Sequence, residues 1–223
     1  MKKLFTYSWI PVLVLALTSI SFASCSNDDD NGIPTPLEAT AVDLGLSVKW
    51  ASCNVGATNL EDCGSFFAWG ETEEKSEYSD QTYKYGSIVG DYSKYNSTDR
   101  KNTLDPEDDV ATIKWGGAWR MPTSLEVEEL LTSCIWTWTT QNGVNGWVAK
   151  GPNENSIFLP TTGSYEDDEI YDKSSDLYLW TSTVSSGSNY KLADILGFDG
   201  KNDDGRIYQN QRNFGLPVRP VCE

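Results

Sequence analysis

The position of the helix signals constrains the fold of this chain more than any other feature of its sequence. Helix-end signals occur twice, between residues 105 and 133, and strand patterns dominate the chain after residue 133. Asp105 and Pro106 predict a helix start, because an aspartate side chain caps free amides and proline fits the first turn. Thr123 and Glu126 form a capping box, which predicts the start of a second helix. Two helices followed by a run of strands indicate an α+β domain.

Each helix also has an expected end. The first is expected to run to about Lys114 and to stop at Gly116-Gly117, because glycine favours helix termini. The second is expected to continue to about Ser133 and to bury an apolar face. That face consists of Val127, Leu130, Leu131 and Cys134.

Strand patterns are densest after the helices. A Gly-Pro-Asn-Glu-Asn turn at 151–155 joins two of them into an expected hairpin. Between residues 71 and 104, tyrosines punctuate a polar stretch without helical period, so a long loop held by tyrosines or short strands is expected. The expected strands cover residues 42–50, 65–69, 147–150, 156–159, 178–183, 190–198, 206–208 and 216–221.

The N-terminus carries an export signal. Lys2 and Lys3 precede an apolar stretch at residues 9–17, and small residues stand directly before Cys25. The apolar stretch is shorter than the roughly 20 residues that a transmembrane helix needs, so residues 1–24 are expected to be a cleaved signal peptide. Cys25 then becomes the lipid-bearing first residue of a lipoprotein. The alternative is ordinary secretion, with Cys25 as an unmodified thiol.

Residues 25–40 are expected to form a flexible acidic and proline-containing tether, and residues 41–223 one domain. An acidic run directly after the lipid cysteine resembles the export signal of surface-displayed lipoproteins in some Gram-negative anaerobes, which implies an outer-membrane, surface-exposed location. Without residues 1–24 the chain has 15 basic and 33 acidic residues, a net charge of −18. Such a surface repels phosphate backbones, so nucleic acid is excluded as a partner, and membrane contact is expected through the lipid only.

The chain contains no histidine. This absence excludes Ser-His-Asp and Cys-His catalytic arrangements and all His-ligated metal sites. Carboxylate chemistry remains open because acids are plentiful. The four cysteines besides Cys25, namely Cys53, Cys63, Cys134 and Cys222, allow three disulfide pairings, between which the sequence does not choose.

Seven short motifs in a fixed order resemble the Fibrobacter succinogenes major paralogous domain, a family of exported bacterial proteins. They extend over nearly the whole mature chain. The motifs are VDLGL at 42–46, WASCNVGA at 50–57, FAWGET at 67–72, WGGAWRMPT at 115–123, NSIFLP at 155–160, WTST at 180–183 and VRPV at 218–221. The resemblance implies a C-type-lectin-like domain with two helices and a small twisted, mostly antiparallel sheet. In that fold the first and last strands lie together and loops project from one end.

A more distant likeness bears on catalysis. Residues 120–123 with Glu126 resemble a segment of formylglycine-generating enzymes, which share that fold. Those oxidases need a cysteine pair late in the domain, whereas no cysteine lies between Cys134 and Cys222, so their active site does not carry over. The Ca²⁺ and sugar motifs of animal C-type lectins are absent as well. We therefore expect no enzymatic activity, and the fold alone assigns no function.

Three groups of conspicuous residues are interpreted as structural. Arg120 is expected to form an ion pair or to clamp backbone carbonyls beside the helix cap. The acids Glu166, Asp167, Asp168 and Glu169 offer ligands for Ca²⁺ or half of a glycosidase pair, but a solvated loop is favoured; Ca²⁺ stays open and no cofactor is assigned. Tryptophans that cluster around the helices and the hairpin are assigned to the core: Trp115, Trp119, Trp136, Trp138 and Trp147.

The segment from residue 188 to 213 is the expected recognition surface. It mixes aromatic side chains with adaptable hydrogen-bonding ones, a composition typical of binding sites. In related C-type-lectin-like proteins the corresponding late segment faces the ligand; the alternative is a polar sheet edge and turn. The residues expected to bind ligand are Tyr178, Trp180, Asn189, Tyr190, Asn202, Asp203, Arg206, Tyr208, Asn210 and Arg212.

These observations predict a surface-exposed lipoprotein that acts as a non-enzymatic ligand-binding or adhesion module. Its expected partner is a neutral glycan or an extracellular protein, because the strong negative charge disfavours an anionic ligand. The first alternative is a structural or assembly component of a cell-surface complex. The second is a carboxylate-based hydrolase.

Overall fold

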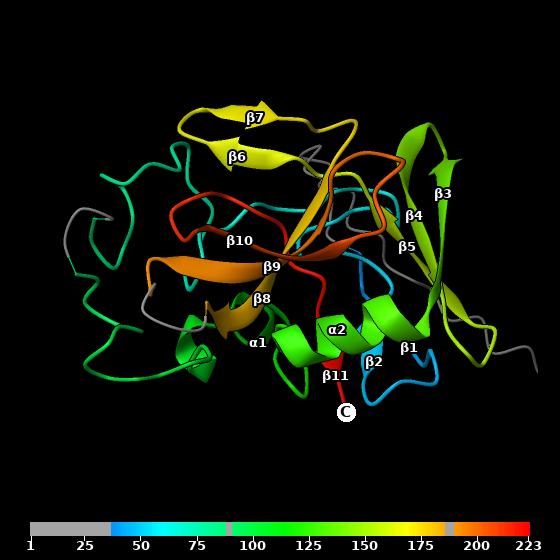
Figure 1. The fold of residues 1–223 in the computed structure, drawn as a ribbon, viewed down its shortest axis with the longest axis horizontal. Coiled ribbons are helices and arrows are strands. Elements are labelled where there is room, and N and C mark those ends of the chain that lie inside the picture. Colours follow the sequence, from blue (N-terminus) through cyan, green and yellow to red (C-terminus); the bar gives the residue numbers. More distant parts are fainter. Residues whose placement is uncertain (1–36, 88–90, 186–189) are drawn as a thin grey trace, which may run out of the picture. The chain divides into compact units, whose positions relative to one another are not determined.

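The computed structural model describes residues 37–87, 91–185 and 190–223. Its strands form three three-stranded sheets, β1-β2-β11, β10-β9-β8 and β3-β4-β5, and the two-stranded sheet β6-β7, all antiparallel (Figure 1). Together with two α-helices they make an α+β fold, as the sequence predicts. The strand bounds are β1 Ala41–Val42, β2 Lys49–Ala51, β3 Ile135–Gln141, β4 Val144–Lys150, β5 Ser156–Pro160, β6 Ser164–Glu166, β7 Glu169–Tyr171, β8 Leu177–Val184, β9 Leu192–Phe198, β10 Arg206–Gln211 and β11 Val221–Cys222.

The sheet β10-β9-β8 lies between two apolar cores. Side chains of a strand alternate between its faces, and in β8 Leu177 and Leu179 enter one core while Trp180 enters the other. The helix α2 (Ser124–Ser133) packs along the face that carries Leu177, and its own Val127 and Leu130 are buried there (Figure 1). Both faces of this sheet are therefore covered, which leaves its end and its edge β10 for contact with other molecules.

The second predicted helix is confirmed. Thr123 caps α2, accepting a hydrogen bond from the Glu126 amide, and the Glu126 carboxylate accepts one from the Thr123 amide at 2.8 Å. Arg120 forms the expected ion pair, with its guanidinium 2.6 and 2.8 Å from the two Glu126 oxygens, and it also bonds the Met121 carbonyl. Of the predicted apolar face, Leu131 is the member that stays half-buried.

The first predicted helix is divided. Pro106–Asp108 form a single 3-10 turn, η1, and the α-helix α1 covers only Val110–Trp115, ending at Gly116 with φ of 63°. The cap of α1 is Asp109, which accepts from the Thr112 amide at 3.0 Å. The side chain of Asp105 makes no capping bond, because Lys94 and Lys101 engage its carboxylate.

The strands near the two ends of the domain lie side by side, since β11 pairs with β2. The stretch predicted as one strand at 42–50 is split into β1 and β2 by a turn, and 65–69 makes a bridge from Phe67 to Leu216 without forming a strand among the described residues. The predicted strand at 216–221 is reduced to the short β11. Short pairings of this kind leave the connecting loops to be held by side chains.

The tyrosine-rich stretch is a long loop held by buried tyrosines, as predicted. Within the described part of residues 71–104 there is no helix or strand. Hydroxyls of Tyr83 and Tyr85 donate to the carbonyls of Trp69 and Gly70 at 2.7 and 3.0 Å, which anchors the loop to the chain before it. The buried tyrosines of the loop are Tyr78, Tyr83, Tyr85, Tyr92 and Tyr95.

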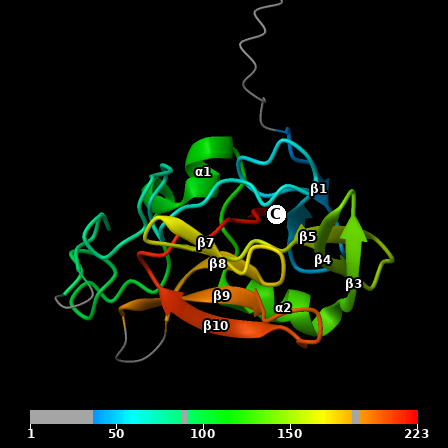
Figure 2. The same ribbon diagram turned by 90° about the horizontal axis from the view of Figure 1, so that it is seen from above.

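The predicted hairpin is present as β4 and β5, and β3 extends it on the other side (Figure 2). The expected strands do not include β3, although Asn142-Gly143 is a strong hairpin signal and both residues adopt positive φ in the turn. Trp147 is buried and stacks on Phe198 of β9, with the ring centres 4.6 Å apart. This contact joins the sheet β3-β4-β5 to the sheet β10-β9-β8, which we call the central sheet. The other four tryptophans assigned to the core are half-buried: Trp115, Trp119, Trp136 and Trp138.

Candidate functional site

The structure brings part of the predicted recognition surface together at one end of the sheet β10-β9-β8. Tyr178 on β8, Tyr208 and Arg206 on β10, and Asp203 in the turn between β9 and β10 form one polar cluster. Asn202 is exposed in that turn, whereas Asn210 and Tyr190 are half-buried and belong to the other end of the hairpin. Asn189 lies outside the described residues.

Two tyrosine hydroxyls converge on one carboxylate in this cluster. The Tyr178 hydroxyl lies 2.5 Å from Oδ1 of Asp199, and the Tyr208 hydroxyl lies 2.8 Å from its Oδ2. Asp176 accepts from Tyr178 at 3.1 Å, and Asp203 accepts from Tyr208 at 3.0 Å. Each hydroxyl has one proton for two acceptors, so oxygen lone pairs and an exposed carboxylate remain for an incoming ligand.

A glycine allows the two tyrosine rings to approach each other across β9. Gly197 pairs with Tyr178 on one side and with Arg206 on the other. A Cβ atom at this position would lie 2.4 Å from Cδ2 of Tyr208 and 3.2 Å from Cδ1 of Tyr178. The Tyr208 ring therefore covers the glycine, and the position of the cluster depends on the absence of a side chain there.

Asp203 is the fixed charge of the cluster. Burial alone would raise the pKa of its carboxyl, but hydrogen bonds from the Asp199 amide, Arg206 and Tyr208 outweigh burial and lower the pKa to about 2. The Arg206 guanidinium lies 2.9 Å from Asp203 and 5.1 Å from the centre of the Tyr208 ring. Because its side chain is 63% exposed, Arg206 presents a cation at the rim of the surface.

Two of the predicted ligand-binding residues need correction, because the structure places them in the core. Trp180 is 1% exposed, and its indole N–H donates to the Phe67 carbonyl at 2.8 Å. Arg212 is fully buried and lies 4.6 Å from the Trp69 ring and 4.4 Å from the Tyr92 ring. Neither side chain reaches the surface, so neither contributes to recognition there.

Arg212 is the centre of the tyrosine loop. Its guanidinium donates to the Tyr83 hydroxyl and to the backbone carbonyls of Lys94, Tyr95 and Tyr190. Among the described residues it forms no ion pair. Carbonyl oxygens and aromatic faces therefore balance this buried charge.

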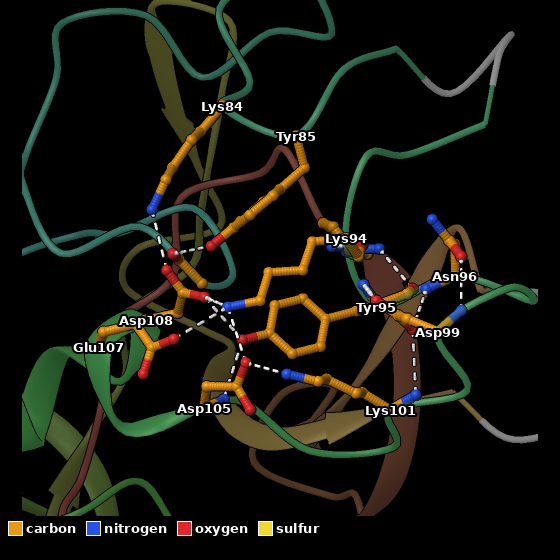
Figure 3. Close-up of polar contacts among 12 residues, drawn as sticks. Lys84, Tyr85, Lys94, Tyr95, Asn96, Asp99, Lys101, Asp105, Glu107 and Asp108 are labelled. Carbon is orange, nitrogen blue, oxygen red and sulfur yellow. Dashed lines mark hydrogen bonds and ion pairs between the residues drawn. The ribbon is translucent and has the colours of Figure 1, made fainter.

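A group of three acids, Asp105, Glu107 and Asp108, has the spacing of a metal site, but an internal cation lies within it (Figure 3). The Lys94 ammonium is 2.7, 3.3 and 2.5 Å from these three carboxylates. Lys84 adds a second cation at 2.9 Å from Asp108. Because lysine charges already neutralise the group, we interpret it as a structural network that holds the tyrosine loop on η1.

The acids Glu166 to Glu169 lie at the turn between β6 and β7. Asp167, Asp168 and Glu169 are exposed, and the backbone of Asp167 pairs with Tyr78. Exposed acids on a hairpin turn agree with the favoured interpretation of a solvated loop.

A separate cleft in the described part of the chain has a volume of about 500 Å³. It is lined by the loop after β2, the β3–β4 turn, Thr161 and the chain before β8. Sequence patterns do not reveal it, because its charged residues, Glu61, Asp62 and Lys173, come from segments that no local pattern connects. The one local signal near the cleft is the Asn142-Gly143 turn, because Gly143 belongs to its lining.

All four cysteines of the described domain, Cys53, Cys63, Cys134 and Cys222, carry free thiols. Cys63 lies in the cleft and is half-buried, and burial raises the pKa of its thiol. A protonated thiol is a weak nucleophile, so Cys63 is part of the cleft wall.

None of the helices within the described residues has the length and apolar character of a membrane span. No protein-family model, curated protein or solved structure matches this chain. Its function is therefore inferred from its own residues and their geometry.

Proposed function

We propose that this protein is an exported, lipid-anchored module at the outer-membrane surface that binds an extracellular ligand and catalyses no reaction. The observation that carries the proposal is the convergence of Tyr178 and Tyr208 on Asp199 at the exposed end of the central sheet. Aromatic rings that end in hydrogen-bonding groups are typical of recognition surfaces. The signal peptide and Cys25 supply the export and the anchor in this proposal.

The pairing of β2 with β11 supports a C-type-lectin-like fold for the domain, because strands from opposite ends of the chain meet there. The long tyrosine-anchored loop supports it too, since it leaves the sheet to be covered by irregular chain. In this fold the late hairpin, β9 to β10, presents the ligand-facing surface.

The charges of the surface restrict the ligand. The cluster contains three carboxylates, Asp176, Asp199 and Asp203, and the guanidinium of Arg206, which bonds Asp203. An anionic ligand would meet a surplus of negative charge, on a chain that is itself strongly acidic. Carboxylates accept hydrogen bonds from hydroxyl groups and phenols both accept and donate them, so a neutral glycan is our first choice, ahead of a protein.

The test combines a glycan array with substitutions that remove only hydroxyl groups. Tyr178→Phe and Tyr208→Phe keep both rings and should each weaken the specific array signal about tenfold, the effect of about 1.4 kcal/mol. Tyr171→Phe is the matched control, because the Tyr171 hydroxyl also contacts a carboxylate, that of Glu169, at 3.2 Å on a different hairpin. It should bind as the parent does.

A flat array with co-purifying envelope proteins would contradict the proposal and favour an assembly component. Equal losses in all three Phe variants would also contradict it, because they would show that the effect does not come from the cluster around Asp199.

A further inference from the structure

The cleft that the sequence did not reveal is built from four separate segments. Its walls are the loop at 56–64, the turn at 143–145, Thr161 after β5 and residues 173–174 before β8. Ligand sites are commonly formed by loops that converge from distant parts of a chain. Its volume of about 500 Å³ falls within the common range for such sites.

Hydrogen bonds hold the walls in place. The Asp62 carboxylate accepts from the amides of Thr58 and Asn59 at 3.0 and 2.9 Å, which folds the first loop. Glu61 accepts from the Asn142 side chain at 2.8 Å and so ties this loop to the β3–β4 turn. On the other side, the side-chain amide of Asn145 donates to the Ser174 carbonyl at 3.1 Å. The cleft is therefore formed before a ligand enters.

Charges of opposite sign stand apart in this cleft. Glu61 and Asp62 belong to one wall and Lys173 to another, and no ion pair within the described residues involves any of the three. Lys173 is notable because the chain has 33 acids for 17 bases, yet no described carboxylate lies within 4.0 Å of its ammonium. Between these walls the lining is mostly uncharged, with Val144, Cys63 and glycine backbone.

We propose that this cleft binds a small zwitterionic peptide, with its ammonium toward Glu61 and Asp62 and its carboxylate toward Lys173. A purely anionic ligand would be opposed by the two acids, and a purely cationic one by Lys173. A dipeptide, whose two residues of extended chain span about 7 Å, is small enough for a cleft of about 500 Å³. This proposal is independent of the surface around Asp199.

The test uses L-alanyl-L-alanine, its N-acetyl derivative and its C-terminal amide, titrated by calorimetry. The parent should bind the free dipeptide, and each blocked form should bind about tenfold more weakly, since each loses one charge contact. Lys173→Gln should lose the preference for the free carboxylate and keep the preference for the free amine. Glu61→Gln should lose part of the preference for the free amine and keep the preference for the free carboxylate. The loss is partial because Asp62 still contributes charge, and the loop stays in place because Gln retains the acceptor for Asn142.

Lys150→Gln is the matched control, since Lys150 pairs with Glu154 and does not line the cleft. It should bind all three ligands as the parent does, and thermal melting should show every variant folded. If the parent shows no saturable binding of dipeptide at concentrations up to about 1 mM, the proposal is overturned. So would a Lys173→Gln variant that still prefers the free carboxylate over the amide.

Discussion

Replacing Arg212 by Ala should destabilise the protein severely, whereas the same replacement of Arg206 should leave stability close to the parent's. The two arginines lie in one hairpin, six positions apart. Arg206 is 63% exposed, and Arg212 is fully buried. They thus separate surface recognition from core structure, although the sequence predicts recognition for both residues.

The magnitude can be worked out from the contacts of Arg212. Its guanidinium makes four hydrogen bonds to Tyr83, Lys94, Tyr95 and Tyr190, and losing them costs about 1 kcal/mol each. Cation–π contact in a desolvated site adds about 2 kcal/mol. Relief from burying the charge offsets part of this sum, so we expect a net loss of about 3–5 kcal/mol. The free energy of unfolding of a domain is usually about 5–15 kcal/mol, so this loss is a large share of it.

Urea unfolding followed by tryptophan fluorescence measures the loss. Arg212→Lys should be intermediate, because lysine keeps the charge but has fewer and less directed donors. If Arg212→Ala is too unstable to isolate, the lysine variant still yields a midpoint to compare. Unfolding of the Arg212 variants at the same urea concentration as Arg206→Ala would refute the structural role of this guanidinium.

Three further predictions concern the anchor, the helix cap and the pH dependence. Cys25→Ala should move the protein from the membrane fraction to the soluble fraction, and an unchanged distribution would rule out lipid at this residue. Thr123→Ala should lower the free energy of unfolding by about 1 kcal/mol in urea melts, because it leaves an amide of α2 unpaired; an unchanged midpoint would contradict this cap. The folded-state pKa of Asp203 is about 2, below the unfolded value of about 3.9, so its stabilising contribution is present above pH 4 and lost as pH falls toward 2. Urea melts across this range should show the parent losing stability relative to Asp203→Asn, and parallel curves would argue against the shift.

Elements whose bonds join near neighbours in the chain could be predicted from the sequence. The capping box of α2 joins residues three positions apart, so the pattern alone locates it. The β4–β5 hairpin can be located in the same way from its turn and its flanking strand patterns. The α+β class rests on these local signals.

Where distant residues compete for the same group, only the tertiary structure decides. The sequence predicts Asp105 as the cap, but Lys94 and Lys101 occupy the Asp105 carboxylate, while Asp109 is left to bond the amides of Thr112 and Met121. The cap therefore forms at Asp109, four residues later than the local pattern indicates.

The same reason separates the residues of the predicted recognition surface. Arg206 and Arg212 lie in the same stretch of polar and aromatic residues, yet Arg212 bonds Tyr83 and Tyr95, more than 100 positions away. The cleft between Glu61 and Lys173 likewise exists only because four remote loops meet. Sequence determined the local elements and the overall charge, and the packing of distant segments such as the tyrosine loop decided which charged side chains are buried and which are exposed.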